Sequence, residues 1–266
     1  MRRAALPLLI VACVVVAAVL AWLVLQRAFR PATVTTVGPA VAEVLAPGPF
    51  RRIAVNGLAS VEIVQGDRHE VRIEGPAGSV RARVDDGTLT IANRGGKVEL
   101  PLFGGESQVR PRVVVTAPAI DAIAADGAVQ IVARRLETPS LRIAASGATK
   151  IRIDDLEAET LRLSGAGAVH VEIGGRVRDQ SISLSGAGDY RGARLESESA
   201  KISVAGAGRV VVNAAKSLNA SLSGAGSVEY LGDPEVKQSV SGIGSIKRRE
   251  KSAAAARARF RPAAPA

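Results

Sequence analysis

The sequence of 266 residues contains few of the side chains that most often build reaction centres. It has one cysteine, Cys13, which lies in an apolar segment near the beginning of the chain. The remainder therefore has no disulfide and no thiol that could act as a nucleophile or a metal ligand. Two histidines are too few for a multi-histidine zinc site. Aromatic residues make up 3% of the chain, so platforms on which sugars or bases could stack are scarce.

The carboxylates and serines do not form a recognisable catalytic pattern either. Asp154 and Asp155 are the best local acidic pair, but neighbouring residues of a strand point to opposite faces. No G-x-S-x-G segment is present, and the glycine-rich segments lead from strand to strand, not into a helix that could hold a phosphate. The sequence therefore predicts no catalytic residue, no metal ligand and no cofactor-binding residue. His170 and His69 are expected to be solvated polar residues.

The net charge of +10 comes from the two ends of the chain. Residues 1–30 hold four of the 35 basic residues and none of the 25 acidic ones. Residues 247–266 hold seven basic residues and one acidic residue. This leaves 24 basic and 24 acidic residues for the body, residues 31–246. A balanced body argues against a basic nucleic-acid groove, so we expect no nucleic acid partner.

The second half of the chain is a repeat with a step of about twenty residues. In L-R-L-S-G-A-G-A-V-H-V-E-I, residues 161–173, every second residue is apolar or glycine, as in an extended chain with one buried face. The first glycines of seven such copies are 20, 18, 21, 20, 18 and 18 residues apart. One unit of this length cannot bury its own apolar face, so successive units must stack. We therefore predict an all-β, single-domain parallel β-helix, or β-solenoid, with coils of 18–21 residues.

Glycines mark each repeat and suit a sharp bend, because glycine adopts backbone angles that other residues avoid. The structural repeat glycines are Gly127, Gly147, Gly165, Gly167, Gly186, Gly188, Gly206, Gly208, Gly224, Gly226, Gly242 and Gly244. Small residues flank them at outward positions. These are the serines Ser146, Ser164, Ser185, Ser223 and Ser241 and the alanines Ala148, Ala166, Ala187, Ala207 and Ala225. Stacked coils would align them in a flat strip, which either merely suits a tight corner or is a docking surface.

These repeats, together with the segments that precede them, resemble a bacterial family. Several S-G-A-G copies follow F-R-R-I-A-V-N-G, V-E-I-V-Q-G-D, D-D-G-T-L-T-I and V-V-V-T-A-P. The ordered set is similar to DUF2807, the putative auto-transporter adhesin, head GIN domain family, over about residues 50–246. The resemblance implies a right-handed parallel β-helix and an adhesin-like role. It supplies no catalytic residue.

The two ends differ from the body in composition. Residues 4–25 carry no charge and are long enough to cross a membrane. Residues 1–30 are therefore predicted to be a transmembrane helix or, alternatively, a cleaved signal helix or a lipoprotein signal with Cys13 in its processing box. Residues 31–49 are expected to form a Pro/Ala-rich linker and residues 50–246 the β-solenoid. Residues 247–266 are expected to form a basic, disordered tail that could also contact anionic lipid.

Two details of the body carry expectations about its strands and edges. Asn56 and Gly57 predict a turn that separates two short strands. The last coil, which ends near Ile246, would leave an open β-edge that the following charged residues guard. If that guard is loose, end-to-end self-association follows.

For function, we expect a non-enzymatic binding or scaffold module of the cell envelope, anchored in the inner membrane and facing the periplasm, or exported. Its partner there would be a protein or a glycan. One alternative is a carbohydrate-active β-helix enzyme, a polysaccharide lyase or hydrolase, which would need several carboxylates converging in a groove. A second alternative is an envelope sensing or signalling partner.

Overall fold

The computed structural model describes residues 41–75, 80–93, 97–100, 105–108 and 111–250. The predicted anchor or signal segment, most of the linker and nearly all of the predicted tail lie outside these residues. The described residues of Gly38–Val98 and Glu106–Ala266 belong to one compact unit, which contains all the features discussed below except part of the strand pair formed by residues 97–100 and 105–108. Within the described ranges the chain is all-β, and none of its segments forms a helix suited to crossing a membrane.

Fourteen strands make up the described part of the chain. They are β1 (Val41–Leu45), β2 (Arg52–Gln65), β3 (Glu70–Gly75), β4 (Val80–Asp85), β5 (Thr88–Asn93), β6 (Lys97–Leu100), β7 (Gly105–Gln108), β8 (Arg112–Ala117), β9 (Ala122–Gly186), β10 (Asp189–Gly206), β11 (Arg209–Gly224), β12 (Ser227–Leu231), β13 (Glu235–Gly242) and β14 (Ser245–Arg248). Twelve of them form a single sheet, and β6 and β7 pair with each other.

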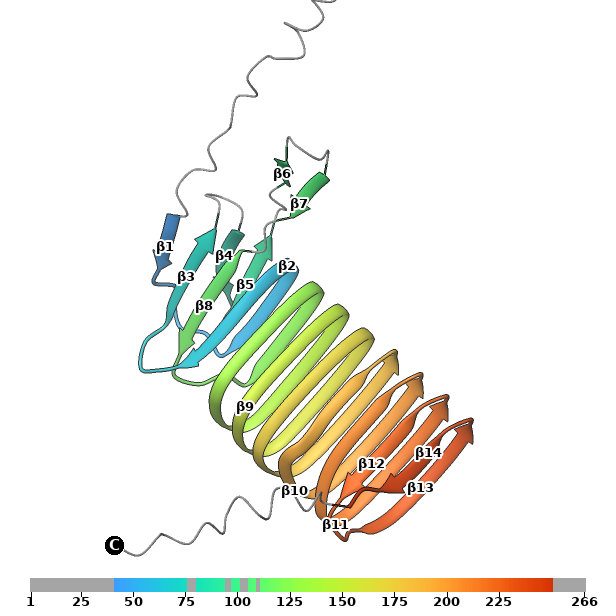
Figure 1. Ribbon diagram of the computed structural model, residues 1–266. Helices are drawn as coiled ribbons and strands as arrows, with labels where there is room; N and C mark the ends of the chain where they lie inside the picture. Colours follow the sequence, from blue (N-terminus) through green and yellow to red (C-terminus); the bar gives the residue numbers. More distant parts are fainter. Residues whose placement is uncertain (1–40, 76–79, 94–96, 101–104, 109–110, 251–266) are drawn as a thin grey trace, which may run out of the picture. The chain divides into compact units, whose positions relative to one another are not determined.

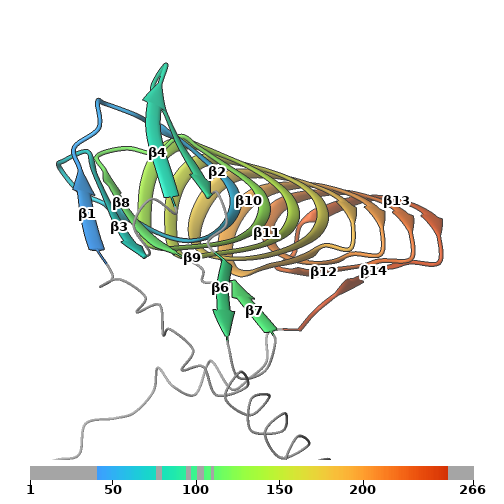
Figure 2. The ribbon, with the colours of Figure 1, turned by 90° about the horizontal axis from the view of Figure 1, so that it is seen from above.

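The large sheet is mostly parallel and winds in successive turns (Figures 1 and 2). Strand β9 alone has 65 residues, and it bends repeatedly so that each turn lies beside the one before it (Figure 1). Parallel pairing then continues from β9 to β10, from β10 to β11, and from β11 to both β12 and β13. This arrangement is β-helix-like. Antiparallel pairs occur only near its beginning, where β1 and β8 pair with β3, and β4 pairs with β5.

The core follows the alternation seen in the sequence. Leu161, Leu163, Val169, Val171 and Ile173 are all at most 2% exposed, and the outward residues between them are exposed or half-buried. Each fully buried side chain of this size contributes roughly 1.5–3 kcal/mol relative to an exposed one. Since inward residues of successive turns join one continuous cluster, no turn is stable without its neighbours.

One glycine of each turn lies directly over a glycine of the turn before. A Cβ added to Gly147 would lie 2.6 Å from the carbonyl oxygen of Gly127, and one added to Gly167 would lie 2.8 Å from that of Gly147. The aligned set, here called the glycine file, is Gly57, Gly127, Gly147, Gly167, Gly186, Gly206, Gly224 and Gly242. The steps from Gly127 onward are 20, 20, 19, 20, 18 and 18 residues.

The glycine file corrects the sequence alignment at one repeat. Gly165 was expected in the file, but it occupies an inward position two residues earlier, where the preceding turn has Ala145. Leu184 of the next turn fills the space, with its Cδ2 atom 2.7 Å from the point where a Cβ of Gly165 would lie. A shift of two residues keeps every side chain on its own face, so the alternation could not reveal the error.

The expected turn at Asn56 and Gly57 is also wrong. Strand β2 runs through both residues without a break. Gly57 has a φ of +97° and is the first residue of the glycine file. Gly57 is paired in parallel with Gly127, so β2 is the first turn of the winding sheet and β9 begins the second. The intervening chain forms the short strands β3 to β8.

The last turn is only partly covered. Strands β13 and β14 each have a single parallel partner among the described residues, β11 and β12 respectively. Val240 is 45% exposed and Ile243 is 92% exposed. The open edge that the sequence predicted is therefore present in the described part of the chain, whereas self-association there stays a prediction.

Candidate binding surfaces

Acidic and histidine side chains do not converge on a centre in the described ranges. No three of them lie close enough together there to hold a metal ion. Asp154 forms an ion pair with Arg152 at 2.8 Å, and its neighbour Asp155 points away as an exposed residue. The acidic pair at 154–155 is thus a surface feature, as its place on consecutive strand positions predicted.

The two histidines have defined polar partners. His170 is half-buried, and its Nδ1 atom lies 3.1 Å from Oδ2 of Asp189, which also pairs with Arg191 at 2.9 Å. The backbone N–H of Phe50 points at Nδ1 of His69, with a separation of 3.5 Å, and the two rings lie 4.9 Å apart. Each histidine is therefore partly exposed to solvent and has one polar neighbour.

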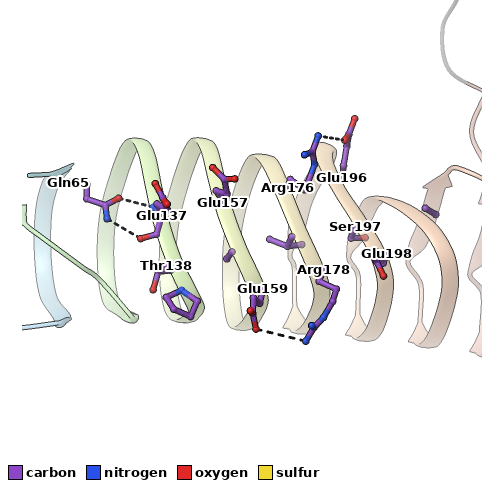
Figure 3. A pocket seen from close by; sticks show the side chains of 14 residues that line it. Gln65, Glu137, Thr138, Glu157, Glu159, Arg176, Arg178, Glu196, Ser197 and Glu198 are labelled. Carbon is purple, nitrogen blue, oxygen red and sulfur yellow. Dashed lines mark hydrogen bonds and ion pairs between the residues drawn. The ribbon is translucent and has the colours of Figure 1, made fainter.

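An open groove of about 850 Å³ crosses several turns at one corner of the winding sheet (Figure 3). Gln65 fixes its first edge, because its Nε2 atom donates to the carbonyl of Glu137 at 2.9 Å and its Oε1 atom accepts from the N–H of Glu137 at 2.7 Å. Thr138 lies beside this clamp and donates its hydroxyl to Asp121 at 3.1 Å. The first turn is thereby tied to the second at this corner.

Five of the fourteen residues that line the groove are carboxylates. They are Glu137, Glu157, Glu159, Glu196 and Glu198, and their side chains are 50% to 69% exposed. Arg176 pairs with Glu196 at 3.5 Å, and Arg178 lies 4.0 Å from Glu159 (Figure 3). Exposed pairs of this kind contribute little to stability. The groove is therefore an open surface with an excess of acidic side chains, all five of which are exposed.

Below the groove, Asp179 is held in its charged form. The hydroxyl of Ser199 donates to it, and the guanidinium of Arg178 lies 3.1 Å from its Oδ2 atom. These two interactions, the hydroxyl first, lower the pKa of Asp179 below its ordinary value. Asp179 therefore serves as a fixed anion that orders neighbouring turns.

The glycine-flanking residues lie on the surface, but the corrected register rearranges them. Ser146, Ser185, Ser223 and Ser241 each directly precede a residue of the glycine file, and all four are exposed or half-buried. Ser164 does not share this row, because Ala166 precedes Gly167. In the row that follows the glycines, Ala168 likewise takes the place expected for Ala166. From Gly147 onward, the row on one side is Ser146, Ala166, Ser185, Ala205, Ser223 and Ser241, and its two earlier positions are Asn56 and Asp126. The row on the other side contains Ala128, Ala148, Ala168, Ala187, Ala207 and Ala225.

Sequence reasoning missed a more regular row of hydroxyls. The position three residues before each file glycine is a serine in the last five turns, namely Ser164, Ser183, Ser203, Ser221 and Ser239. In the first three turns the same position is occupied by Ala54, Ala124 and Ala144. The parallel register pairs Ser183 with Ser203 and Ser203 with Ser221, and all five serines are exposed. We call these five residues the serine file. Counting back from the correct glycine of each repeat would have found it.

A series of buried hydrogen bonds links three successive turns from within. Tyr190 is fully buried, and its hydroxyl donates to Oε1 of Gln180 at 3.0 Å. Gln180 in turn donates to the hydroxyl of Ser197 at 2.7 Å, and Ser197 donates to the carbonyl of Asn213 at 2.7 Å. Burial raises the pKa of Tyr190, so the phenol stays protonated and remains a donor. These hydrogen bonds satisfy polar groups of the core, and the buried residues that form them are not accessible to a substrate.

The mostly parallel, winding sheet and its shallow outer surfaces define an all-β repeat protein. A model of the family described as "Putative auto-transporter adhesin, head GIN domain" matches residues 49–234, and the chain belongs to this family. The sequence resemblance is thereby confirmed. No curated protein matches the chain in sequence.

Solved structures of bacterial proteins share the fold. A putative adhesin from Bacteroides fragilis is 22% identical with a TM-score of 0.73, and the match covers 80% of this chain and 98% of that one. A putative lipid binding protein from Parabacteroides distasonis is 20% identical over the same shares, with a TM-score of 0.64. A putative adhesin from Parabacteroides distasonis is 21% identical, again over 80% and 98%, with a TM-score of 0.59.

Proposed function

We propose that the chain is a non-enzymatic binding module of the bacterial cell envelope whose repeats form a right-handed parallel β-helix. The family supports an adhesin-like role, and the stacked turns give the module a long, regular exterior. In this proposal residues 50–246 are the binding domain. Residues 1–30 are a membrane anchor or signal, residues 31–49 a linker and residues 247–266 a basic tail. The module would face the periplasm from the inner membrane or be exported.

The observation that carries a binding role is the flat outer face beside the glycine file. From Ser164 onward, its serine file and the neighbouring row of serines and alanines place small exposed side chains at each turn. A partner could approach the sheet closely along this whole face and bond to hydroxyls that repeat about every 4.8 Å. We propose that a protein or glycan partner docks there.

The acidic groove of Figure 3 favours the enzyme alternative less than the binding role. A glycosidase needs one carboxyl group that stays protonated near neutral pH, and desolvation is the usual cause. Glu157 and Glu159 are 61% and 69% exposed, and Arg135 and Arg178 lie 3.5 and 4.0 Å from them. Both side chains are open to solvent, so the groove lacks the enclosed carboxyl group that such an enzyme needs.

Binding of the full-length chain to isolated envelope fractions tests the proposal. Replacing Ser183 and Ser221 by tyrosine keeps the charge and a residue type suited to strands, but it adds two rings to the flat face. We expect envelope binding to weaken by about tenfold or more. Tyrosines at Gln130 and Ser227, which lie on the opposite side of the glycine file, should leave binding within about twofold. If the unmodified chain does not bind envelope fractions, the proposed binding role is wrong. If both variants lose the same amount of binding, the partner does not dock on the proposed face.

A further inference from the structure

The face that carries the serine file also carries a row of cations along one edge. Five residues before each file glycine stand Arg52, Ala122, Arg142, Arg162, Ser181, Lys201, Asn219 and Lys237. The parallel register confirms the row, since Arg52 pairs with Ala122, Lys201 with Ser181 and Asn219, and Asn219 with Lys237. We call its five basic members the cation file. The row contains no acidic residue.

The cations in the middle of this file have no anionic partner in the described part of the chain. Among the described residues, Arg142, Arg162 and Lys201 are exposed and form no ion pair. At the ends of the file, Arg52 donates to a backbone carbonyl, that of Asp86, and Lys237 pairs only with Glu235 of its own strand at 3.7 Å.

Two of these unpaired cations are direct neighbours. Arg142 and Arg162 occupy equivalent positions in successive turns, as do Ser140 and Thr160 two residues before them, whose hydroxyls are 2.8 Å apart. Adjacent strands lie about 4.8 Å apart, and like charges placed opposite each other on adjacent strands destabilise a sheet. The fold itself therefore gains nothing from this arrangement.

Charges on the other side of the glycine file are arranged differently. There, Glu172 accepts from Arg194 at 2.9 Å and lies 3.7 Å from Arg152, so three successive turns are linked by one carboxylate. Asp189 similarly bridges Arg191 and the half-buried His170. Carboxylates on this side thus pair with Arg152, Arg191 and Arg194, whereas Lys150 and Arg209 there form no ion pair among the described residues. The row of the cation file differs because it contains no carboxylate, so its charges are available to an external anion.

A cavity lies where the cation file begins. It has a volume of about 850 Å³, and Arg51, Arg52, Arg142 and His69 contribute its basic lining. The one carboxylate among its lining residues, that of Asp121, is already paired with Arg51 at 2.8 Å. The cavity therefore retains an excess of positive charge, and it gives the end of an elongated anion a recess to enter.

We propose that this face binds an acidic polysaccharide along the cation file. Arginine forks match the geometry of carboxylates, and the adjacent serine hydroxyls would bond to sugar hydroxyls. A linear polymer fits a single row of charges better than a broad anionic surface does. None of the residues in the cation file or the serine file is aromatic, so the stacking platforms used for single-stranded nucleic acids are missing. This inference rests on the proposed binding function and names its ligand class.

The test measures binding of polygalacturonate, a polymer of acidic sugars, to the full-length chain, with neutral dextran as the reference. The variant Arg142→Gln, Arg162→Gln, Lys201→Gln should lose affinity on the order of 10- to 100-fold. Its affinity should also depend less steeply on salt, because fewer ion contacts form. Thermal unfolding checks that the variant folds, and removing neighbouring like charges should leave its Tm unchanged or raise it.

A charge-matched control separates this face from general electrostatics. Arg134→Gln, Lys150→Gln, Arg209→Gln also removes three exposed cations that form no ion pair among the described residues, and these lie outside the cation file. The control should retain polygalacturonate binding within about threefold. Equal weakening of both variants, no binding of polygalacturonate, or tighter binding of single-stranded DNA than of polygalacturonate would overturn the inference.

The outcome also separates this inference from the broader proposal. If the unmodified chain binds envelope fractions and the triple variant binds them equally well, the ligand class is wrong and the envelope role stands. If the unmodified chain binds polygalacturonate but no envelope fraction, the site is real and the envelope role fails.

Discussion

Gly175→Ala is expected to lower the free energy of unfolding by about 3–5 kcal/mol, from backbone strain and overpacking together. Gly175 has a φ of +114°, which residues with a Cβ rarely adopt. A Cβ placed there would lie 2.2 Å from the carbonyl oxygen and 2.4 Å from the nitrogen of Leu156 in the preceding turn. Both atoms belong to the backbone, so the two turns would have to separate. Urea unfolding followed by circular dichroism measures the loss.

Gly165→Ala is the matched control, since it makes the same chemical change at an inward position. Gly165 has no positive φ, and its closest contact would be Cδ2 of Leu184 at 2.7 Å. The end of a leucine side chain can rotate away, so the cost should stay below about 1.5 kcal/mol. A result in which Gly165→Ala costs as much as Gly175→Ala would show that the turns do not stack in the register described above.

Tyr190→Ala should lower the free energy of unfolding by about 3–5 kcal/mol, because it removes a fully buried ring and leaves a cavity. The ring packs against Gly192, where an added Cβ would lie 2.7 Å from Cε1 of Tyr190. Its partners in the adjacent turns, Val171 and Val210, are held by the sheet and cannot fill the space. Equilibrium unfolding in urea provides the measurement, and a cost below about 1 kcal/mol would mean that the ring is not part of the core.

Tyr190→Phe separates the hydroxyl from the ring. The ring stays packed, but Gln180 loses the donor that lies 3.0 Å from its Oε1 atom. An unsatisfied buried acceptor costs about 1–3 kcal/mol, so this variant should lie between the wild type and Tyr190→Ala. A Tyr190→Phe protein as unstable as Tyr190→Ala would instead place most of the stabilisation in the polar chain through Gln180 and Ser197.

Fold class could be predicted from the sequence because the signal for it is local. The alternation in residues 161–173 says which side chains point inward, whatever lies next to them. The register between turns depends on which residues of different copies lie side by side, and a shift of two residues leaves the alternation unchanged. Gly165 and Gly167 differ in this way. The stacking of Gly167 on Gly147 and the packing of Leu184 against the bare Gly165 together distinguish the two alignments.

The surface was harder to predict for the same reason. Ser164 belongs with Ser183 and Ser203, but the uncorrected alignment placed it with Ser146 and Ser185. Two features of the sequence obscured the cation file. Successive positions of its row are 18 to 20 residues apart from Ala122 onward, and the total charge of the body is balanced. Charge becomes informative only after the register shows which residues share a face.

Disulfide trapping tests the register of the stacked turns most directly. In a Cys13→Ser background, Ser164→Cys combined with Ser183→Cys should form a disulfide under mild oxidation. Neighbouring positions of adjacent strands are about 4.8 Å apart, which lies within the Cα separation that a disulfide spans. Peptide mass spectrometry after digestion would detect the cross-link. Ser164→Cys combined with Ser185→Cys, the pair that the uncorrected alignment places together, should stay reduced, and a disulfide in this second pair but not in the first would contradict the account.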